Sequence, residues 1–360
     1  MSLQLTIRIF CMNNDWANFL QTQQAHIDET GVSHFADDAA VADQQTDLLC
    51  DLSQLGLLRF SGEDAASFLQ GQLSNDINVL DGSQSQISSY CSPKGRILAS
   101  LRVFRDGDDF YLLIPADTLA ATKKRLQMYV MMSKVNIDDL SDETVRIGIS
   151  GQQANTALQQ LSLNAPENSN GYVHHNNVHI LNISSTCPRY ILISDAKTIQ
   201  PAWEAMKSDL PMKGYNSWNY MDIQDAIPGI VAATVDAFVP QMVNLHAING
   251  VSFSKGCYPG QEIVARMHFL GKLKRRMYRA TVHADQAPKP GDSVFSANST
   301  SGQGAGQIVT SAPLGDGNYE ILAVIQISAK ETGELHLHDI DGSVLQFRDI
   351  PYTVSLEREK

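Results

Sequence analysis

A short internal repeat constrains the fold of this chain more than any other feature. Residues 60–65 (FSGEDA) are echoed by residues 149–154 (ISGQQA), and in each copy a leucine, Leu69 or Leu158, stands seven residues after the glycine. A β-prone run precedes the Ser-Gly pair, and a helical pattern follows it. A chain of 360 residues that repeats such a unit is expected to form two related modules rather than one core.

The two copies also continue in the same way. The first continues into a hairpin around residues 106–108 (DGD), a helix over roughly 117–131 and a strand at 134–137. The second continues into two β-prone runs between 172 and 194 and a helix near 198–209. The fold class predicted is therefore α+β, with two ferredoxin-like modules whose sheets are antiparallel.

Composition divides the rest of the chain. Residues 1–50 pass from a short strand-like start into a polar, acidic stretch, and are expected to be a solvated N-terminal extension. The two modules are expected over 51–140 and 141–275. Over residues 276–360, short β-prone runs alternate with clusters of Gly, Pro, Asn and Asp and no convincing helix interrupts them, which predicts a C-terminal β-barrel.

Charge and composition argue against several classes of protein. A net charge of −12 does not suit a general nucleic-acid-binding protein, which needs a broad basic surface. No apolar run approaches the ~18 to 20 residues of a membrane helix, and no secretory signal is visible, so no membrane contact and a cytoplasmic location are expected. Five widely spaced cysteines without a CxxC pair predict a reducing compartment and no metal site.

The most chemically suggestive segment is KGCYPGQE, residues 255–262. Residues 259–260 (PG) force a turn and residues 261–268 have helical character, so Cys257 is expected just before a helix N-terminus and beside Lys255. Both neighbours would stabilise a thiolate. A cysteine so placed is a nucleophile, a redox centre or a soft-metal ligand, unless it is simply buried in a tight turn.

This motif and its flanks resemble a known family. Residues 241–266, including QMVNL and NGVSFS before KGCYPGQEIVAR, resemble the signature block of the YgfZ-type folate-binding proteins. These are in the superfamily of the glycine-cleavage aminomethyltransferase, the T-protein. Residues 68–76 (FLQGQLSND) are similar to the family's first helix and turn, and residues 94–96 (KGR) precede the expected hairpin. Trp218 and residues 223–228 resemble the helix before the signature.

The resemblance implies three domains in a ring around a central hole that binds tetrahydrofolate. It also implies a role in maintaining iron–sulfur enzymes, including those that methylthiolate tRNA. In the T-protein branch the carboxylate at the place of Asp76 lies by the reactive folate nitrogens, although an Asx turn explains Asp76 equally well. Trp218 would stack near the pterin or belong to the core, and Tyr258 is counted with the folate-binding residues.

The sequence departs from the family at two places. Where relatives commonly have a Glu that hydrogen-bonds the pterin, this chain has Gln224, with Asp225 next to it. An amide donates and accepts but supplies no charge, so the folate affinity at that position is left open. Near Leu55, where some relatives have a Trp that borders the folate, this chain has only an aliphatic residue.

A basic run over residues 266–279 follows the motif and contains no acid. It could hold the glutamate tail of a folate, for which Arg266 and Arg276 are the predicted residues, or contact tRNA phosphates. The alternative is a solvated linker between domains. The cations predicted to contact tRNA are Lys272, Lys274, Arg275 and Arg276.

Three histidines, His174, His175 and His179, suggest a metal site at first sight. On one continuous strand, however, 175 and 179 share a face while 174 points away, and no Cys or acid stands at ligand spacing. A structural or surface role is therefore expected.

The resulting hypothesis is a folate-dependent accessory protein in which Cys257, assisted by Lys255, handles the reactive step. That step is thiol exchange, one-carbon chemistry or transient contact with a cluster. One alternative is a true aminomethyltransferase, against which the Cys257 motif argues because the T-protein branch has no cysteine there. A second alternative is a non-catalytic scaffold that holds tRNA or an iron–sulfur client through the basic run.

Overall fold

The protein is described here by a computed structural model. The structure describes residues 12–28, 31–36, 42, 46–183, 185–297 and 304–354. The strand-like start expected near the N-terminus lies outside these residues. None of the described helices combines the length and apolarity needed to cross a membrane.

The first module is a five-stranded antiparallel sheet in the order β5-β6-β7-β4-β8. Its helices α2 and α3 pack on one face of the sheet around a core of its own. The predicted hairpin is confirmed, since β6 and β7 pair on either side of Gly107. In chain order the elements are β4 (Leu55–Ser61), α2 (Ala65–Gln70), the 3-10 helix η1 (Ile77–Val79), β5 (Ser85–Cys91), β6 (Ile97–Asp106), β7 (Asp109–Pro115), α3 (Ala116–Val130) and β8 (Asn136–Asp139).

The second module repeats this arrangement, except that one edge strand comes from an earlier part of the chain. Its sheet has the order β10-β11-β12-β9-β3, and α4 and α5 cover one face. In the first module, the edge strand beside β4 is β8. In the second module, the edge strand beside β9 is β3 (Leu48–Asp51), which precedes the first module in the chain. The other elements are β9 (Val145–Ser150), α4 (Ala154–Gln160), β10 (Tyr172–His175), β11 (Val178–Asn182), β12 (Arg189–Ser194) and α5 (Ala196–Met206).

The sequence repeat marks an equivalent turn in both modules. Ser61 and Ser150 end β4 and β9, and the glycines that follow have φ of +110° at Gly62 and +98° at Gly151. A side chain at either glycine would collide with the backbone of Lys134 or with Asp47. Only glycine suits such a turn, so the repeated glycine reflects the same backbone conformation in both modules. The prediction of two related α+β modules is confirmed.

The prediction of a solvated N-terminal extension is wrong for its described part. Helix α1 (Asn14–Thr22) is followed by the hairpin of β1 (Ala25–Asp28) and β2 (Gly31–Phe35). Trp16 and Leu20 are fully buried, and the indole of Trp16 packs edge-on against Trp203 of α5. The polar composition hid an amphipathic helix whose apolar face covers the second module.

The C-terminal part is a six-stranded antiparallel sheet that curls into a half-barrel, in the order β17-β14-β15-β16-β13-β18. A short helix, α8 (Ile327–Thr332), follows β16 where no helix was expected. The strands are β13 (Arg275–His283), β14 (Ser293–Phe295), β15 (Gly306–Gly315), β16 (Asn318–Gln326), β17 (His336–Leu337) and β18 (Gln346–Arg348).

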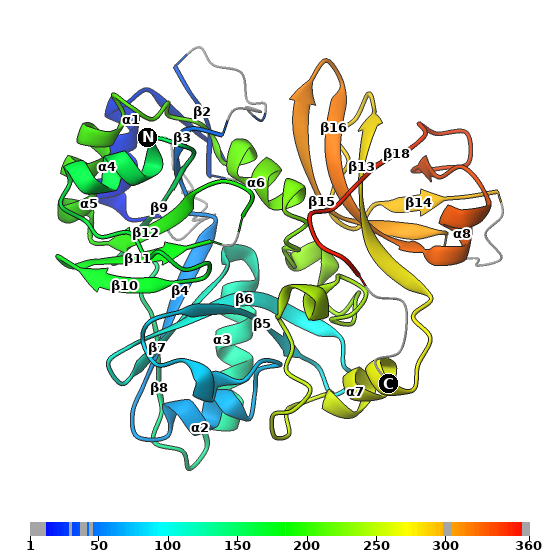
Figure 1. The fold of residues 1–360 in the computed structure, drawn as a ribbon, viewed down its shortest axis with the longest axis horizontal. Coiled ribbons are helices and arrows are strands. Elements are labelled where there is room, and N and C mark those ends of the chain that lie inside the picture. Colours follow the sequence, from blue (N-terminus) through cyan, green and yellow to red (C-terminus); the bar gives the residue numbers. More distant parts are fainter. Residues whose placement is uncertain are drawn as a thin grey trace, which may run out of the picture.

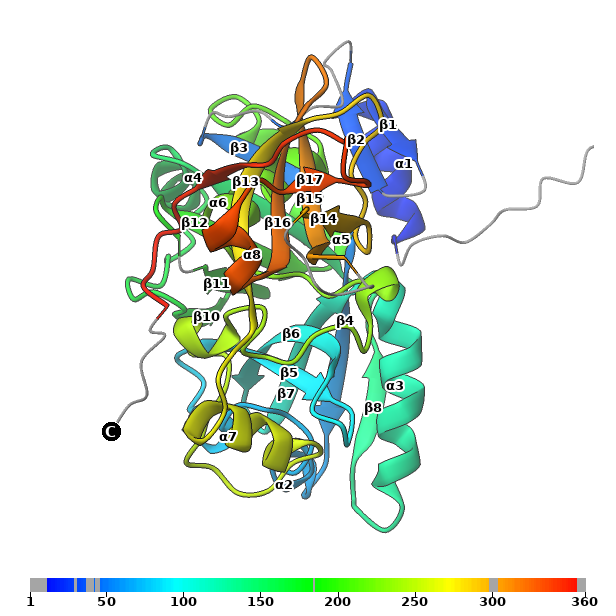
Figure 2. The same cartoon turned by 90° about the vertical axis from the view of Figure 1, so that its right-hand side faces the viewer.

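The three parts surround a centre that is crossed by the connecting segment between them (Figure 1). The two modules share an apolar core between their sheets, to which Trp218 of α6 contributes. A further core joins α6, the start of β6 and the half-barrel. The connecting elements are α6 (Tyr215–Gln224), η2 (Ala232–Thr234), η3 (Leu245–Ile248) and α7 (Gln261–Phe269), the last lying beside the first module (Figure 2).

Candidate functional site

A cavity of about 420 Å³ opens where the two modules, α6 and the half-barrel meet. Its walls are mainly apolar, with a few polar groups, and its volume lies within the ~300–1,000 Å³ typical of small-molecule sites. Leu55 and Leu101 come from the first module, Ile191 from the second, and Thr310 from the half-barrel. This is the place where the ring of three domains implied by the family resemblance would bind its ligand.

Charged groups lie buried behind and within the cavity wall. The Arg189 guanidinium is fully buried and pairs with Asp222 at 2.8 Å and with Asp225 at 3.4 Å. Burial raises the pKa of Asp222, an effect that Arg189 opposes. Burial also lowers the pKa of Arg102, another lining residue, to about 10. The cavity therefore presents a carboxylate, Asp222, that a cation holds in place.

Trp218, which the family resemblance places near the pterin, is among the residues that line the cavity, and its ring is largely covered by protein. The side chain is 3% exposed, and the guanidinium of Arg189 lies 3.9 Å from the ring centroid. A side chain at Gly148 would collide with the same ring. Trp218 thus belongs to the core and the cavity wall at once.

Gln224 does not line the cavity. Its amide nitrogen donates to the Tyr220 hydroxyl at 2.7 Å, whereas Asp222 faces the cavity. Sequence reasoning missed Asp222, although helical spacing could have found it. Asp222 follows Trp218 by four residues and shares its face of α6, while Gln224 follows by six and does not.

Lys255 is directed into the first module. Its ammonium donates to the backbone oxygens of Gln70 at 2.6 Å, Leu73 at 2.6 Å and Asn75 at 3.0 Å. Burial lowers the pKa of Lys255 to about 8, an effect that the charge of Asp76 opposes. The lysine therefore clamps the motif onto the turn that follows α2.

Cys257 is exposed, so the alternative of a cysteine buried in a tight turn is wrong. Helix α7 begins at Gln261, after Gly260 with a φ of +79°. A side chain at Gly260 would collide with the backbone of Ser92 and Gly95, so this glycine lets the motif approach the first module closely. Cys257 is not among the residues that line the cavity.

Asp76 caps the short helix η1. One of its carboxylate oxygens accepts from the Asn78 backbone at 3.1 Å and from the Gln70 amide at 3.0 Å. This is the local turn that was the alternative explanation of Asp76. The adjacent Asn75 donates to the backbone of Ile87 at 2.9 Å, and Ile87 lines the cavity, so the turn clamped by Lys255 backs the cavity wall.

The other predicted folate residues lie away from the cavity lining. Tyr258 is 6% exposed, and burial raises its pKa. Arg266 is exposed in the last turn of α7, and Arg276 of β13 covers the Tyr278 ring at 4.6 Å. Of the residues predicted for folate, Trp218 is the one that lines this cavity in the described part of the chain.

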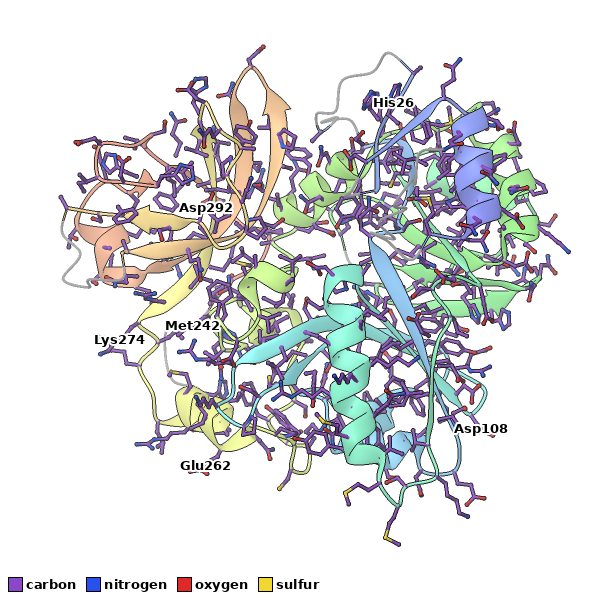
Figure 3. All side chains as sticks on the ribbon, turned by 180° about the vertical axis from the view of Figure 1, so that it is seen from behind. His26, Asp108, Met242, Glu262, Lys274 and Asp292 are labelled. Atoms are coloured by element: carbon purple, nitrogen blue, oxygen red, sulfur yellow. The ribbon has the colours of Figure 1, made fainter. Side chains whose placement is uncertain are left out.

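The basic run divides into two parts. Lys272 and Lys274 are exposed on the link between α7 and β13, where Lys274 lies at the outer edge of the molecule (Figure 3). Arg275 donates to the backbone of Gly304, and Arg279 pairs with Glu320 in the half-barrel. Within the basic run, Lys272 and Lys274 are thus the residues that are both exposed and on the link between α7 and β13.

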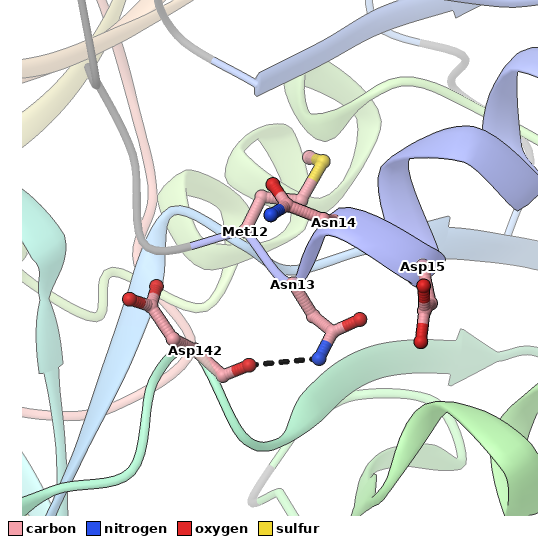
Figure 4. Close-up of a pocket in the computed structure, with 5 residues that line it drawn as sticks. All are labelled: Met12, Asn13, Asn14, Asp15 and Asp142. Carbon is pink, nitrogen blue, oxygen red and sulfur yellow. Dashed lines mark hydrogen bonds between the residues drawn. The ribbon is translucent and has the colours of Figure 1, made fainter.

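A second pocket, of about 260 Å³, lies at the start of α1 and shares no lining residue with the central cavity (Figure 4). Asn13 caps α1 by accepting from the Trp16 backbone at 3.1 Å, and its amide donates to the Asp142 backbone at 2.7 Å. These bonds tie α1 to the segment between β8 and β9, which connects the two modules, and this is a structural role.

The chain is similar to known proteins over most of its length. The family model of the GCVT N-terminal domain matches residues 17–191. A tRNA-modifying protein YgfZ from Colwellia psychrerythraea is 33% identical over 312 residues, which cover 86% of this chain and 94% of the relative. The same-named protein of Yersinia pseudotuberculosis is 29% identical over 310 residues, with the same coverage.

The fold has a counterpart among solved structures. The glycine cleavage system aminomethyltransferase T from Bartonella henselae superposes with a TM-score of 0.67 over 94% of this chain and 97% of that chain, at 15% identity. That likeness confirms the predicted T-protein-like fold. Taken with the identity to the Colwellia protein over almost its whole length, it leads to one conclusion: the chain belongs to the YgfZ family.

Proposed function

We propose that the central cavity binds tetrahydrofolate or a one-carbon derivative, and that the protein supports tRNA modification as an accessory to iron–sulfur enzymes. The observation that carries this proposal is the cavity of about 420 Å³ at the junction of all three parts. The name of the curated relatives, tRNA-modifying protein, supports the second half of it.

The residues of the cavity suit a folate. Flat pterin and benzoyl rings need apolar walls, which Leu101 and Ile191 provide. The guanidine-like edge of a pterin needs a negatively charged acceptor, and Asp222 takes over the role that Gln224 cannot fill. Gln54 adds an amide whose buried nitrogen and oxygen have no hydrogen-bond partner within the described ranges.

In this proposal the chain's own groups divide the work. Arg189 orients Asp222 and favours its charged form, which opposes the burial that raises the pKa of this carboxyl group. Lys255 is a positioning residue that holds the motif against the turn behind Ile87. Bound tetrahydrofolate would supply the nitrogen atoms that carry one-carbon units. Cys257, being exposed, would meet a client enzyme or its cluster from outside.

Calorimetric titration of tetrahydrofolate into the protein tests the folate site. We expect one site in the wild type, at least tenfold weaker binding in Asp222→Asn, and wild-type binding in the control Gln224→Ala. Thermal melts of each variant establish that the fold is intact. Absence of binding in the wild type would end the folate proposal, and equal losses in the two variants would remove the role of Asp222.

Two other functions have a specific observation behind them. The fold shared with an aminomethyltransferase favours transfer of the carbon of an aminomethyl group to folate, with release of ammonia. Turnover with an aminomethylated carrier protein and tetrahydrofolate would establish that activity in place of the accessory role. The exposed lysines of the link favour a tRNA-holding scaffold, which would bind tRNA equally well without folate.

A further inference from the structure

Asp106, His174 and His179 meet at the seam between the two modules. His174 and His179 stand directly opposite each other in the β10–β11 pair, and their rings stack with centroids 4.2 Å apart. Asp106, at the end of β6 in the first module, brings a carboxylate oxygen to 3.0 Å from Nδ1 of His174. One ligand atom from each of the three residues lies within 4.8 Å of the other two.

This arrangement overturns the sequence-based reasoning on the histidines. The run 172–182 is not one strand, because it reverses at Asn176 and Asn177, which both have positive φ. The reversal places His174 and His179 on the same face of the hairpin. The acid that was missing from the local sequence comes from the other module, 68 residues before His174.

We propose that Asp106, His174 and His179 form a binding site for a divalent transition-metal ion of the zinc class. Imidazole nitrogens with one carboxylate oxygen are a donor set that such ions prefer, whereas magnesium and calcium prefer oxygen alone. In a tetrahedral zinc site the ligand atoms lie roughly 3.3 Å apart, since each is about 2.0–2.1 Å from the metal. The separation of 3.0 Å is close to this spacing, and all three ligand atoms lie within 4.8 Å of one another, so binding an ion requires the side chains to move closer together.

The surroundings suit a bound ion. The Tyr172 hydroxyl lies 2.8 Å from Nδ1 of His179 and orients that ring, as an outer hydrogen bond does for metal-bound histidines. The side chains of His174 and Asp106 are 36% and 30% exposed, which gives an ion a path from solvent. Three protein ligands leave a fourth position for water.

Such an ion would join the two modules. The backbones already meet beside it, where Ser85 donates to Asn170 and Tyr172 donates to Ser83. Phe104 of the first module also packs against Tyr172 at 4.9 Å between ring centroids. A metal ion shared by both sides would stabilise this contact, and its binding free energy would add to the stability of the folded protein.

The test uses the full chain, freed of metal and titrated with Zn²⁺ and, separately, Mg²⁺ by calorimetry. The variants are His174→Ala and Asp106→Asn, and the matched control is His175→Ala, which removes the neighbouring imidazole from the opposite face of β10. Because an exposed thiol such as that of Cys257 can also bind zinc, the decisive quantity is the difference between these variants. Absorption of the Co²⁺ form reports the ligand geometry.

We expect His174→Ala and Asp106→Asn to weaken zinc binding at least tenfold, His175→Ala to bind like the wild type, and Mg²⁺ not to compete. Zinc should also raise the melting temperature of the wild type and of His175→Ala more than that of His174→Ala. If the wild type binds zinc no more tightly than His174→Ala, or His175→Ala loses binding to the same degree, the three residues form a hydrogen-bonded cluster only and the proposal is overturned.

Discussion

The side-chain nitrogen of Lys255 lies 2.6 Å from the backbone oxygen of Leu73, a residue 182 positions earlier in the chain. The lysine of the family motif therefore holds the motif to the first module through hydrogen bonds, in addition to being a neighbour of Cys257. Lys255 and Cys257 are accordingly expected to have different roles, with Lys255 supporting the structure and Cys257 available at the surface.

The buried charge of Lys255 predicts a pH dependence of stability. Burial lowers its pKa from 10.5 to about 8, so the unfolded chain binds more protons than the folded one between these two pH values. The contribution of Lys255 to the free energy of unfolding should therefore rise with pH from about 8 to 10.5. Urea unfolding of the wild type and of Lys255→Met at several pH values measures it. A difference between the two proteins that stays flat or falls over this range would contradict the prediction.

Substitution of Cys257 should separate chemistry from folding. Because the side chain is exposed, Cys257→Ala should change the free energy of unfolding by no more than about 0.5 kcal/mol. It should nevertheless lower iron–sulfur enzyme activity when it replaces the wild type in a deletion strain, whereas Cys187→Ala, outside the motif, should not. Full restoration of that activity by Cys257→Ala would remove the proposed chemical role of the cysteine.

The cavity should accept a larger ring at Leu55. Leu55 lines the cavity, near the position where the family resemblance implies a folate-bordering Trp in some relatives. Leu55→Trp is expected to tighten tetrahydrofolate binding about two- to tenfold, since aromatic stacking contributes about 0.5–1.5 kcal/mol. Calorimetry against the wild type measures the change. Weaker binding would mean that the indole fills the space that the ligand needs.

The exposed lysines of the link can be tested for tRNA binding. Neutralising Lys272 and Lys274 should weaken tRNA binding and reduce the dependence of log K on log salt by roughly one unit for each phosphate that is no longer neutralised. The control is a double substitution of Lys124 and Lys197, which are exposed on α3 and α5. Filter binding over a series of salt concentrations gives both slopes. If log K falls with log salt at the same slope in the two double variants, the basic run is a solvated linker and not a tRNA contact.

Local patterns predicted the modules well because turns and strands depend on neighbouring residues. The Ser-Gly turns at Gly62 and Gly151 and the hairpin at Gly107 all follow from glycine at a required backbone position. The apolar stripe of Trp16 and Leu20 was missed because acidic neighbours obscured it, and it became visible only through packing against α5. The turn at Asn176 and Asn177 could have been read from the sequence, because paired asparagines suit two successive positive φ values.

The functional residues were harder to predict because their neighbours are distant in the sequence. The motif located the Lys255 clamp, but its three acceptors are backbone oxygens of the first module, which carry no sequence signal. The residues that line the cavity come from all three parts. Asp222 is recognised as a candidate binding residue only once its ion pair with Arg189 is seen. The same holds for Asp106, which meets the histidines only after both modules have folded.

The origin of β3 has a consequence for how the protein can be divided. Since β3 comes before the first module and pairs with β9, the second module is discontinuous in the chain, and the first is an insertion within it. A cut at residue 140 would therefore separate the second sheet from its own edge strand and leave the backbone of β9 unpaired on that side. A circular permutant that carries residues 46–51 after α5 would restore that edge on a continuous module.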